Sequence, residues 1–68
     1  MELSGRNQLK ATVKEVNLGG IMAEVTMELD GGAEIVAAIT RRSAERLDLK
    51  PGDSVIAVIK ATEVMVGR

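Results

Sequence analysis

The strongest constraint in this 68-residue chain is an alternation of side chains between two pairs of glycines. Apolar residues occupy every second position over residues 21–29, Gly19-Gly20 precedes this run, and Gly31-Gly32 follows it. Alternation predicts a β-strand with one buried face, and glycines accept the positive φ of tight turns at strand ends. The chain is therefore expected to fold around an antiparallel sheet.

The rest of the chain predicts further strands and one helix. The first run changes phase at Val16, which predicts a β-bulge near Glu15. Thr40 is a suitable N-cap for a short helix. The expected strands are 9–16, 21–29, 33–40, 54–60 and 64–66, with a helix over 41–47. The predicted fold class is mainly β, a five-stranded, OB-like Greek-key barrel with one short helix between strands three and four, in a single domain over residues 1–68.

The size of the chain favours self-association. A domain of this length buries only about 60% of the surface that its unfolded chain exposes, and there is no Cys or His to supply a disulfide or a zinc site. Residues 55–59 and 64–66 are apolar on both strand faces. Either a central strand inside one small barrel or an interface between copies explains this pattern.

Composition argues against several functional classes. No His or Cys and no evident base beside a serine make an enzyme the weakest hypothesis. A net charge of −1 and the lack of aromatic residues disfavour nucleic-acid binding, since bases stack on aromatic rings. The apolar runs are too short to cross a membrane, the N-terminus lacks signal-peptide features, and the acidic residues show no metal-site spacing. We therefore expect a cytoplasmic protein without a direct protein–metal site.

Anion binding has more support, because cations stand beside hydroxyl groups without a carboxylate between them. Ser4 and Arg6 form one such segment, and Lys60 with Thr62 forms another. Their alternative reading is a polar lead-in and an ordinary strand end. Residues 40–43 are a second candidate, with simple helix capping as the alternative. Residues 17–21 are a third, with a bare turn as the alternative.

Several separated motifs, taken together and in order, resemble one family, the molbindins. The segments that carry the resemblance are 4–9, 12–13, 38–40 with Ser43, 47–52 and 58–62. Molbindins are small cytoplasmic molybdate-binding proteins, and the same domain occurs in molybdate-responsive regulators and molybdate-transporter ATPases. The resemblance implies a hexamer, a trimer of dimers, that holds molybdate or tungstate between subunits for storage or homeostasis, without catalysis or a required cofactor. An OB-type nucleic-acid-binding module and a purely structural oligomerisation module are the alternatives.

The resemblance also assigns site residues. One subunit would supply Ser4, Arg6, Lys60, Ala61 and Thr62, and its dimer partner would supply Thr40 and Ser43. A second oxyanion site, near the three-fold axis, would use backbone amides of Gly19, Gly20 and Ile21.

The chain departs from the family pattern at two places. Gly5 stands where Ala is frequent, and Arg41-Arg42 stands where polar or acidic residues are common. Two roles are open for the arginine pair, which are attraction of the anion and ion pairing with Glu45 or a neighbouring subunit.

Overall fold

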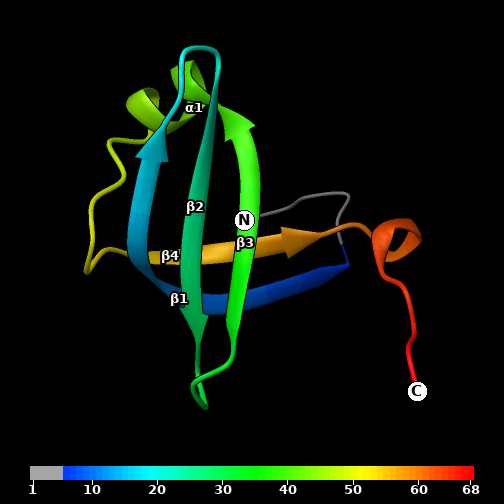
Figure 1. Ribbon diagram of the computed structural model, residues 1–68. Coiled ribbons are helices and arrows are strands. Elements are labelled where there is room, and N and C mark those ends of the chain that lie inside the picture. The colour runs from blue at the N-terminus through cyan, green and yellow to red at the C-terminus, as the bar shows by residue number, and fades with distance from the viewer. Residues whose placement is uncertain (1–5) are drawn as a thin grey trace.

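The computed structural model describes residues 6–68, which form one curled antiparallel sheet with a short helix. Four strands lie in the order β3-β2-β1-β4. Figure 1 shows that β1 bends across the sheet, so that β4 runs almost crosswise beneath β2 and β3. The elements are β1 (Asn7–Leu18), β2 (Met22–Leu29), β3 (Glu34–Thr40), α1 (Arg41–Arg46), β4 (Ser54–Ile59) and the 3-10 turn η1 (Ala61–Glu63). Neither helical element in this described part is long and apolar enough to span a membrane.

A β-bulge allows β1 to serve two neighbours. Val13 pairs with Met27 and Glu15 pairs with Thr26, so Lys14 is the extra residue between these two pairs. A bulge bends a strand and increases its twist. Residues 11–18 of β1 pair with β2 and residues 7–12 pair with β4, so Ala11 and Thr12 pair with both. The bulge predicted near Glu15 is confirmed.

Lys14 also neutralises two glutamates that face each other across β2 and β3. Glu28 and Glu34 are directly paired, and their carboxylates lie 3.5 and 2.6 Å from the Lys14 Nζ. The hydrogen bond and charge of Glu34, with a smaller contribution from Glu28, raise the pKa of Lys14 above its ordinary value of 10.5. The bulge residue thus ties three strands together on the solvent side of the sheet.

The turn between β2 and β3 depends on its glycines. Gly31 and Gly32 have φ values of 100° and 99°, which other residues rarely adopt. The Leu29 amide donates to the Ala33 carbonyl at 2.7 Å, and the Gly32 amide donates to the Leu29 carbonyl at 3.0 Å. This confirms the hairpin predicted from the glycine pair.

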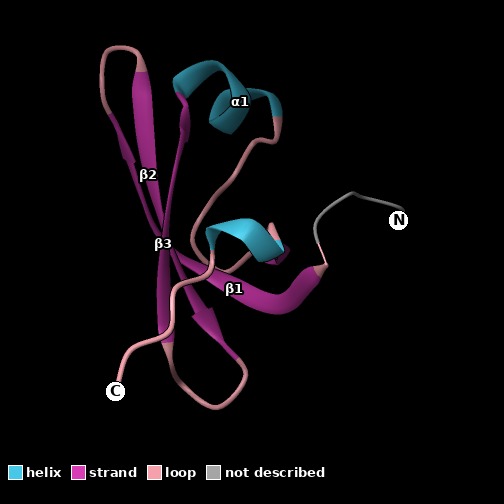
Figure 2. Ribbon diagram, turned by 90° about the vertical axis from the view of Figure 1, so that its right-hand side faces the viewer, coloured by secondary structure: helices cyan, strands magenta, loops and turns pink. Residues whose placement is uncertain are grey.

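The core lies on the concave face of the sheet. Its buried members come from β1, β2 and β4 and are all apolar, namely Ala11, Val13, Val25, Met27 and Ala57. In Figure 2 the β2–β3 hairpin is seen nearly edge-on, with α1 and the bent half of β1 on one side of it. Val13 and Val25 are 1% and 2% exposed, so the centre of this small core is closed even in one copy.

The predicted fifth strand is wrong. Residues 64–68 form no strand, and Val64, Met65 and Val66 are 49%, 93% and 96% exposed. Figure 1 shows this segment leading away from the sheet after η1. A strand that is apolar on both faces needs an edge to pair with and cover on both sides, and one chain does not supply both. The mainly β, OB-like fold class stands, but with four strands and an open side between β3 and β4.

Three smaller expectations also change. The helix ends at Arg46, one residue earlier than predicted, and Leu47, which follows it, is 64% exposed. Ile21 lies in a turn and is 81% exposed, so β2 begins one residue later than predicted. Ile56 and Val58 in β4 are each 41% exposed, so only one face of that strand is covered within a single copy.

Candidate oxyanion site

Arg6 and Lys60 are brought together by the pairing of β1 with β4. The last pair of this ladder is Asn7 with Ile59, so Arg6 and Lys60 are the next two residues, one from each strand. The Asn7 Nδ2 donates to the Ile59 carbonyl at 3.2 Å and fastens this end of the ladder. Both cations are exposed, and neither forms an ion pair within residues 6–68. Two neighbouring cations without a carboxylate attract an anion and repel each other.

The backbone after Lys60 turns at once into η1. Lys60 is its N-cap, with φ −64° and ψ 138°, and no side chain caps this turn. The Glu63 amide donates to the Lys60 carbonyl at 2.9 Å. The exposed residues Ala61 and Thr62 therefore present their backbone beside the two cations. Ser4, the remaining predicted member of this half, lies outside the described residues.

Thr40 and Ser43 form a hydroxyl pair at the start of α1. The Ser43 amide donates to the Thr40 Oγ1 at 3.0 Å, and the Thr40 hydroxyl donates to the Ser43 Oγ at 2.8 Å. Thr40 has an extended backbone, with φ −69° and ψ 147°, as an N-cap requires. The N-cap prediction is confirmed, and the cap fixes both hydroxyls in one place.

The two predicted halves of the site lie at opposite ends of the sheet. Thr40 pairs with Met22, and Ala23 pairs with Leu18, so the hydroxyl pair stands at the end of β1. Arg6 precedes the start of the same strand. Figure 1 shows α1 and η1 well separated. One copy of the chain does not bring these donors together.

The turn between β1 and β2, predicted as a second site, lies against the start of α1. The Gly19 amide donates to the Met22 carbonyl at 2.8 Å, and a Cβ on Gly19 would stand 2.7 Å from that oxygen. Only glycine fits so close an approach. The Arg41 backbone amide donates to the Ile21 carbonyl at 2.7 Å.

The Arg41 side chain adds a contact that sequence reasoning missed. Its Nη1 donates to the Gly19 carbonyl at 3.0 Å, and its Nε lies 3.7 Å from the Glu45 Oε1. The ion pair with Glu45 is one of the two roles that the sequence left open. The contact with Gly19 spans 22 residues of sequence. Its only sequence signal is a cation that directly follows an N-cap residue.

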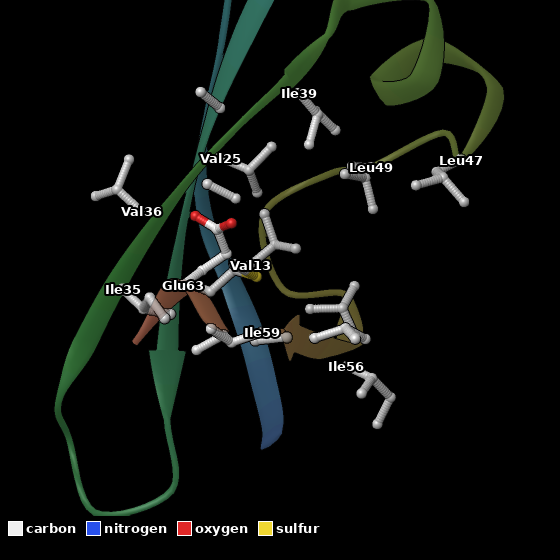
Figure 3. A pocket seen from close by; sticks show the side chains of 16 residues that line it. Val13, Val25, Ile35, Val36, Ile39, Leu47, Leu49, Ile56, Ile59 and Glu63 are labelled. Atoms are coloured by element: carbon white, nitrogen blue, oxygen red, sulfur yellow. The ribbon is translucent and has the colours of Figure 1, made fainter. Parts of the chain in front are cut away.

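The hollow on the concave face is not an anion site. It has a volume of about 670 Å³ and an apolar lining that includes Val13, Val25 and Ile39. Figure 3 shows Glu63, the one charged residue of the lining, with its carboxylate among these apolar side chains. A carboxylate repels an oxyanion, and an apolar lining offers it no hydrogen-bond donors. The hollow is instead the part of the core that β3 and β4 leave open.

The described part of the chain shows no cluster of possible metal ligands. No group of three or more His, Cys, Asp or Glu side chains among residues 6–68 is arranged to hold a metal ion. The donor clusters at the two ends of the sheet are therefore the groups with a clear chemical use. Together with the OB-like fold, they define a small binding module with clustered anion donors.

The chain belongs to the TOBE domain family, whose pattern it matches over residues 3–66. It is 46% identical to molybdenum-pterin-binding protein 1 of Clostridium pasteurianum, with 97% of each chain covered. It is 47% identical to the molybdenum-pterin-binding protein MopA of Rhodobacter capsulatus. That match includes 97% of this chain but only 25% of the longer relative. The relatives are binding proteins by name, and they confirm the resemblance to the molbindins.

Solved structures agree with this assignment. A molybdate-binding protein from Sporomusa ovata superposes with a TM-score of 0.93 at 53% identity, and all of both chains is covered. The cytoplasmic molybdate-binding protein ModG, in a form with molybdate bound, superposes with a TM-score of 0.85 at 49% identity, over 90% of this chain and 43% of ModG. The OB-like fold of this chain is thus the fold of known molybdate-binding proteins.

Proposed function

We propose that this chain, as a single molbindin-type domain over residues 1–68, binds molybdate, and also tungstate, without acting on it chemically. The observation that carries the proposal is the β1–β4 register, which makes Arg6 and Lys60 neighbours with no carboxylate partner within residues 6–68. Molybdate at neutral pH is a fully deprotonated dianion, so a site made only of donors suits it. Hydrogen phosphate needs an acceptor for its proton, and the proposed set has no ionised carboxylate to serve as one.

The proposed site is completed by a second copy. Arg6, Lys60, Ala61 and Thr62, together with Ser4, would hold one side of the oxyanion. Thr40 and Ser43 of another copy would hold the other side, since they stand at the far end of the sheet in their own chain. The N-cap holds the two hydroxyl oxygens close together, and the Thr40 hydroxyl, which donates to the Ser43 Oγ in the free chain, would turn its proton to the anion on binding.

Exposed apolar residues support the proposed assembly, a hexamer built as a trimer of dimers. Large apolar side chains remain uncovered on β3, β4, the end of α1 and the C-terminal segment: Val36, Leu47, Ile56, Val58, Val64, Met65 and Val66. Exposed apolar side chains in this number favour an interface. A second copy that covers it would also supply the buried area that a chain of this size lacks.

The turn of Gly19, Gly20 and Ile21 is proposed as a second oxyanion site. Glycines leave room for a ligand beside the backbone, and no atom stands within 4 Å of the position that a Gly20 Cβ would occupy. The proposed physiological role is storage or homeostasis of molybdate in the cytoplasm, with no required cofactor. The name of ModG, a cytoplasmic molybdate-binding protein, supports this location.

Native mass spectrometry with and without molybdate tests the proposal. We expect a hexamer that gains discrete molybdate masses, with sulfate as the control anion. A stable oligomer that takes up neither molybdate nor tungstate would leave only a structural oligomerisation module. A monomer that binds molybdate tightly would contradict the shared site.

A further inference from the structure

Arg41 holds the turn between β1 and β2 from outside, through its backbone and its side chain. Its backbone amide donates to the Ile21 carbonyl and its guanidinium donates to the Gly19 carbonyl, at 2.7 and 3.0 Å. Glu45 lies on the next turn of the helix, 3.7 Å from the Arg41 Nε, and orients the same guanidinium. The side chain of the neighbouring Arg42 is exposed and forms no ion pair or hydrogen bond within residues 6–68. Of the two adjacent arginines, Arg41 alone is attached to the turn.

These two contacts fix the direction of the Gly20 amide and restrict that of the Ile21 amide. In a planar trans peptide unit the carbonyl and the following N–H point in opposite directions. The Gly19 carbonyl shares its unit with the Gly20 amide, so the bond to Arg41 turns the Gly20 N–H away from Arg41. The Ile21 carbonyl belongs to the peptide unit between Ile21 and Met22, and this carbonyl also accepts a hydrogen bond from Arg41. The peptide unit between Gly20 and Ile21, which carries the Ile21 amide, therefore lies between two units that are hydrogen-bonded to Arg41.

The two amides of this turn have no backbone acceptor within the described residues. Neither the Gly20 nor the Ile21 amide donates a backbone hydrogen bond within the described part of the chain. Both residues are exposed, so these amides face solvent rather than an apolar surface. Amide groups that are oriented and free are the donors from which backbone anion sites are made.

We propose that Arg41 is the positioning residue of the oxyanion site in this turn. Its guanidinium orients the Gly20 amide, and its two bonds together hold the peptide unit of the Ile21 amide between them, so that both amides are available to an anion. It also neutralises the Gly19 carbonyl dipole, which would otherwise repel negative charge. This inference rests on the proposed function, and it assigns a role to a side chain that departs from the molbindin pattern.

Two matched variants separate positioning from simple charge. Arg41→Met and Arg42→Met each remove one positive charge and keep an unbranched stem, but only the first breaks contacts with the turn. Sodium molybdate is titrated calorimetrically into each oligomer, and the Gly20 and Ile21 amide resonances are followed by NMR. We expect both resonances to shift in the unmodified protein. In Arg41→Met the binding that shifts them should weaken about tenfold or more, and in Arg42→Met less than about twofold.

The other outcomes are equally decisive. Equal weakening in both variants would assign the effect to net charge and overturn the proposal. Gly20 and Ile21 resonances that ignore molybdate, while molybdate binds elsewhere, would overturn it as well. If no molybdate binds to the unmodified protein at all, the proposed function itself fails, which is a separate result.

A third variant covers the case in which Arg41→Met does not assemble. Arg41→Lys keeps the charge but replaces the planar fork with a single point donor. We expect weaker binding at the turn than in the unmodified protein, with an altered Gly20 resonance before molybdate is added. Unchanged affinity in Arg41→Lys would overturn the positioning role.

Discussion

The two ends of the sheet offer an anion different things. At the β1–β4 end, Arg6 and Lys60 are adjacent cations without carboxylate partners within residues 6–68. At the α1 end, Thr40 and the turn before β2 offer hydroxyls and amides already held by local hydrogen bonds. One end has positive charge that no carboxylate balances, and the other has polar groups in fixed positions. Under the shared-site proposal an oxyanion uses both, and two copies meet to provide them.

The charged end should show the largest effect. Arg6→Ala or Lys60→Ala removes a charge-assisted contact worth about 1.5 to 3 kcal/mol, so molybdate affinity should fall roughly ten- to hundred-fold. Calorimetric titration measures this loss. Lys10→Ala is the matched control, because Lys10 is another exposed β1 cation, paired within the ladder with Ile56. Unchanged affinity in both Arg6→Ala and Lys60→Ala would remove these residues from the site.

The ordered end should respond to a single methyl group. Gly19→Ala places a Cβ 2.7 Å from the Met22 carbonyl oxygen, and the backbone has to move. Overpacking of this kind lowers the free energy of unfolding by about 1 to 3 kcal/mol. Gly20→Ala is the control, since its Cβ meets nothing within 4 Å. Urea unfolding curves compare the two variants, and equal stabilities would show that the turn is not tightly held.

A smaller effect is expected at the hydroxyl pair. Thr40→Ala removes the N-cap acceptor of Ser43 and should lower stability by about 1 kcal/mol. Under the shared-site proposal it also weakens molybdate binding by another copy. Thr40→Ser keeps the hydroxyl and should retain most of both properties. Full molybdate affinity in Thr40→Ala oligomers would place Thr40 outside the site.

The smallest effect is expected between the two ends, at the bulge. The pKa of Lys14 is raised in the folded chain, chiefly by Glu34, so its contribution to stability is present below about pH 10.5 and is lost as the pH rises through the raised value. Lys14→Met should lose little stability at neutral pH, because the pair is exposed and screened. Unfolding curves of the two proteins should differ slightly at neutral pH and converge at alkaline pH. A difference in stability that stays constant with pH would contradict this assignment.

Local signals in the sequence predicted local structure well. The phase change at Val16 located the bulge, Gly31-Gly32 located a hairpin, and Thr40 located the start of the helix. Each of these depends on residues that are close in the sequence. Period and turn chemistry are sufficient for such features.

Long-range pairing was harder to predict. The fifth strand failed because residues 64–66 have strand character but pair with neither free edge of the sheet, β3 or β4, in their own chain. Arg6 and Lys60 were grouped by residue type and family resemblance, while their adjacency depends on the β1–β4 register. The bond from Arg41 to Gly19 joins two elements whose relative position only the folded sheet defines.

The position of Arg6 and Thr40 at opposite ends of β1 has a consequence for dilution. If each site is shared between two copies, separated subunits hold only half-sites. Molybdate capacity would then follow the law of mass action for subunits, and would fall more steeply than protein concentration below the assembly threshold. The ligand, in turn, would shift subunits toward the assembled state. The amount of protein made would therefore set both how much molybdate can be bound and how steeply that capacity changes with protein concentration.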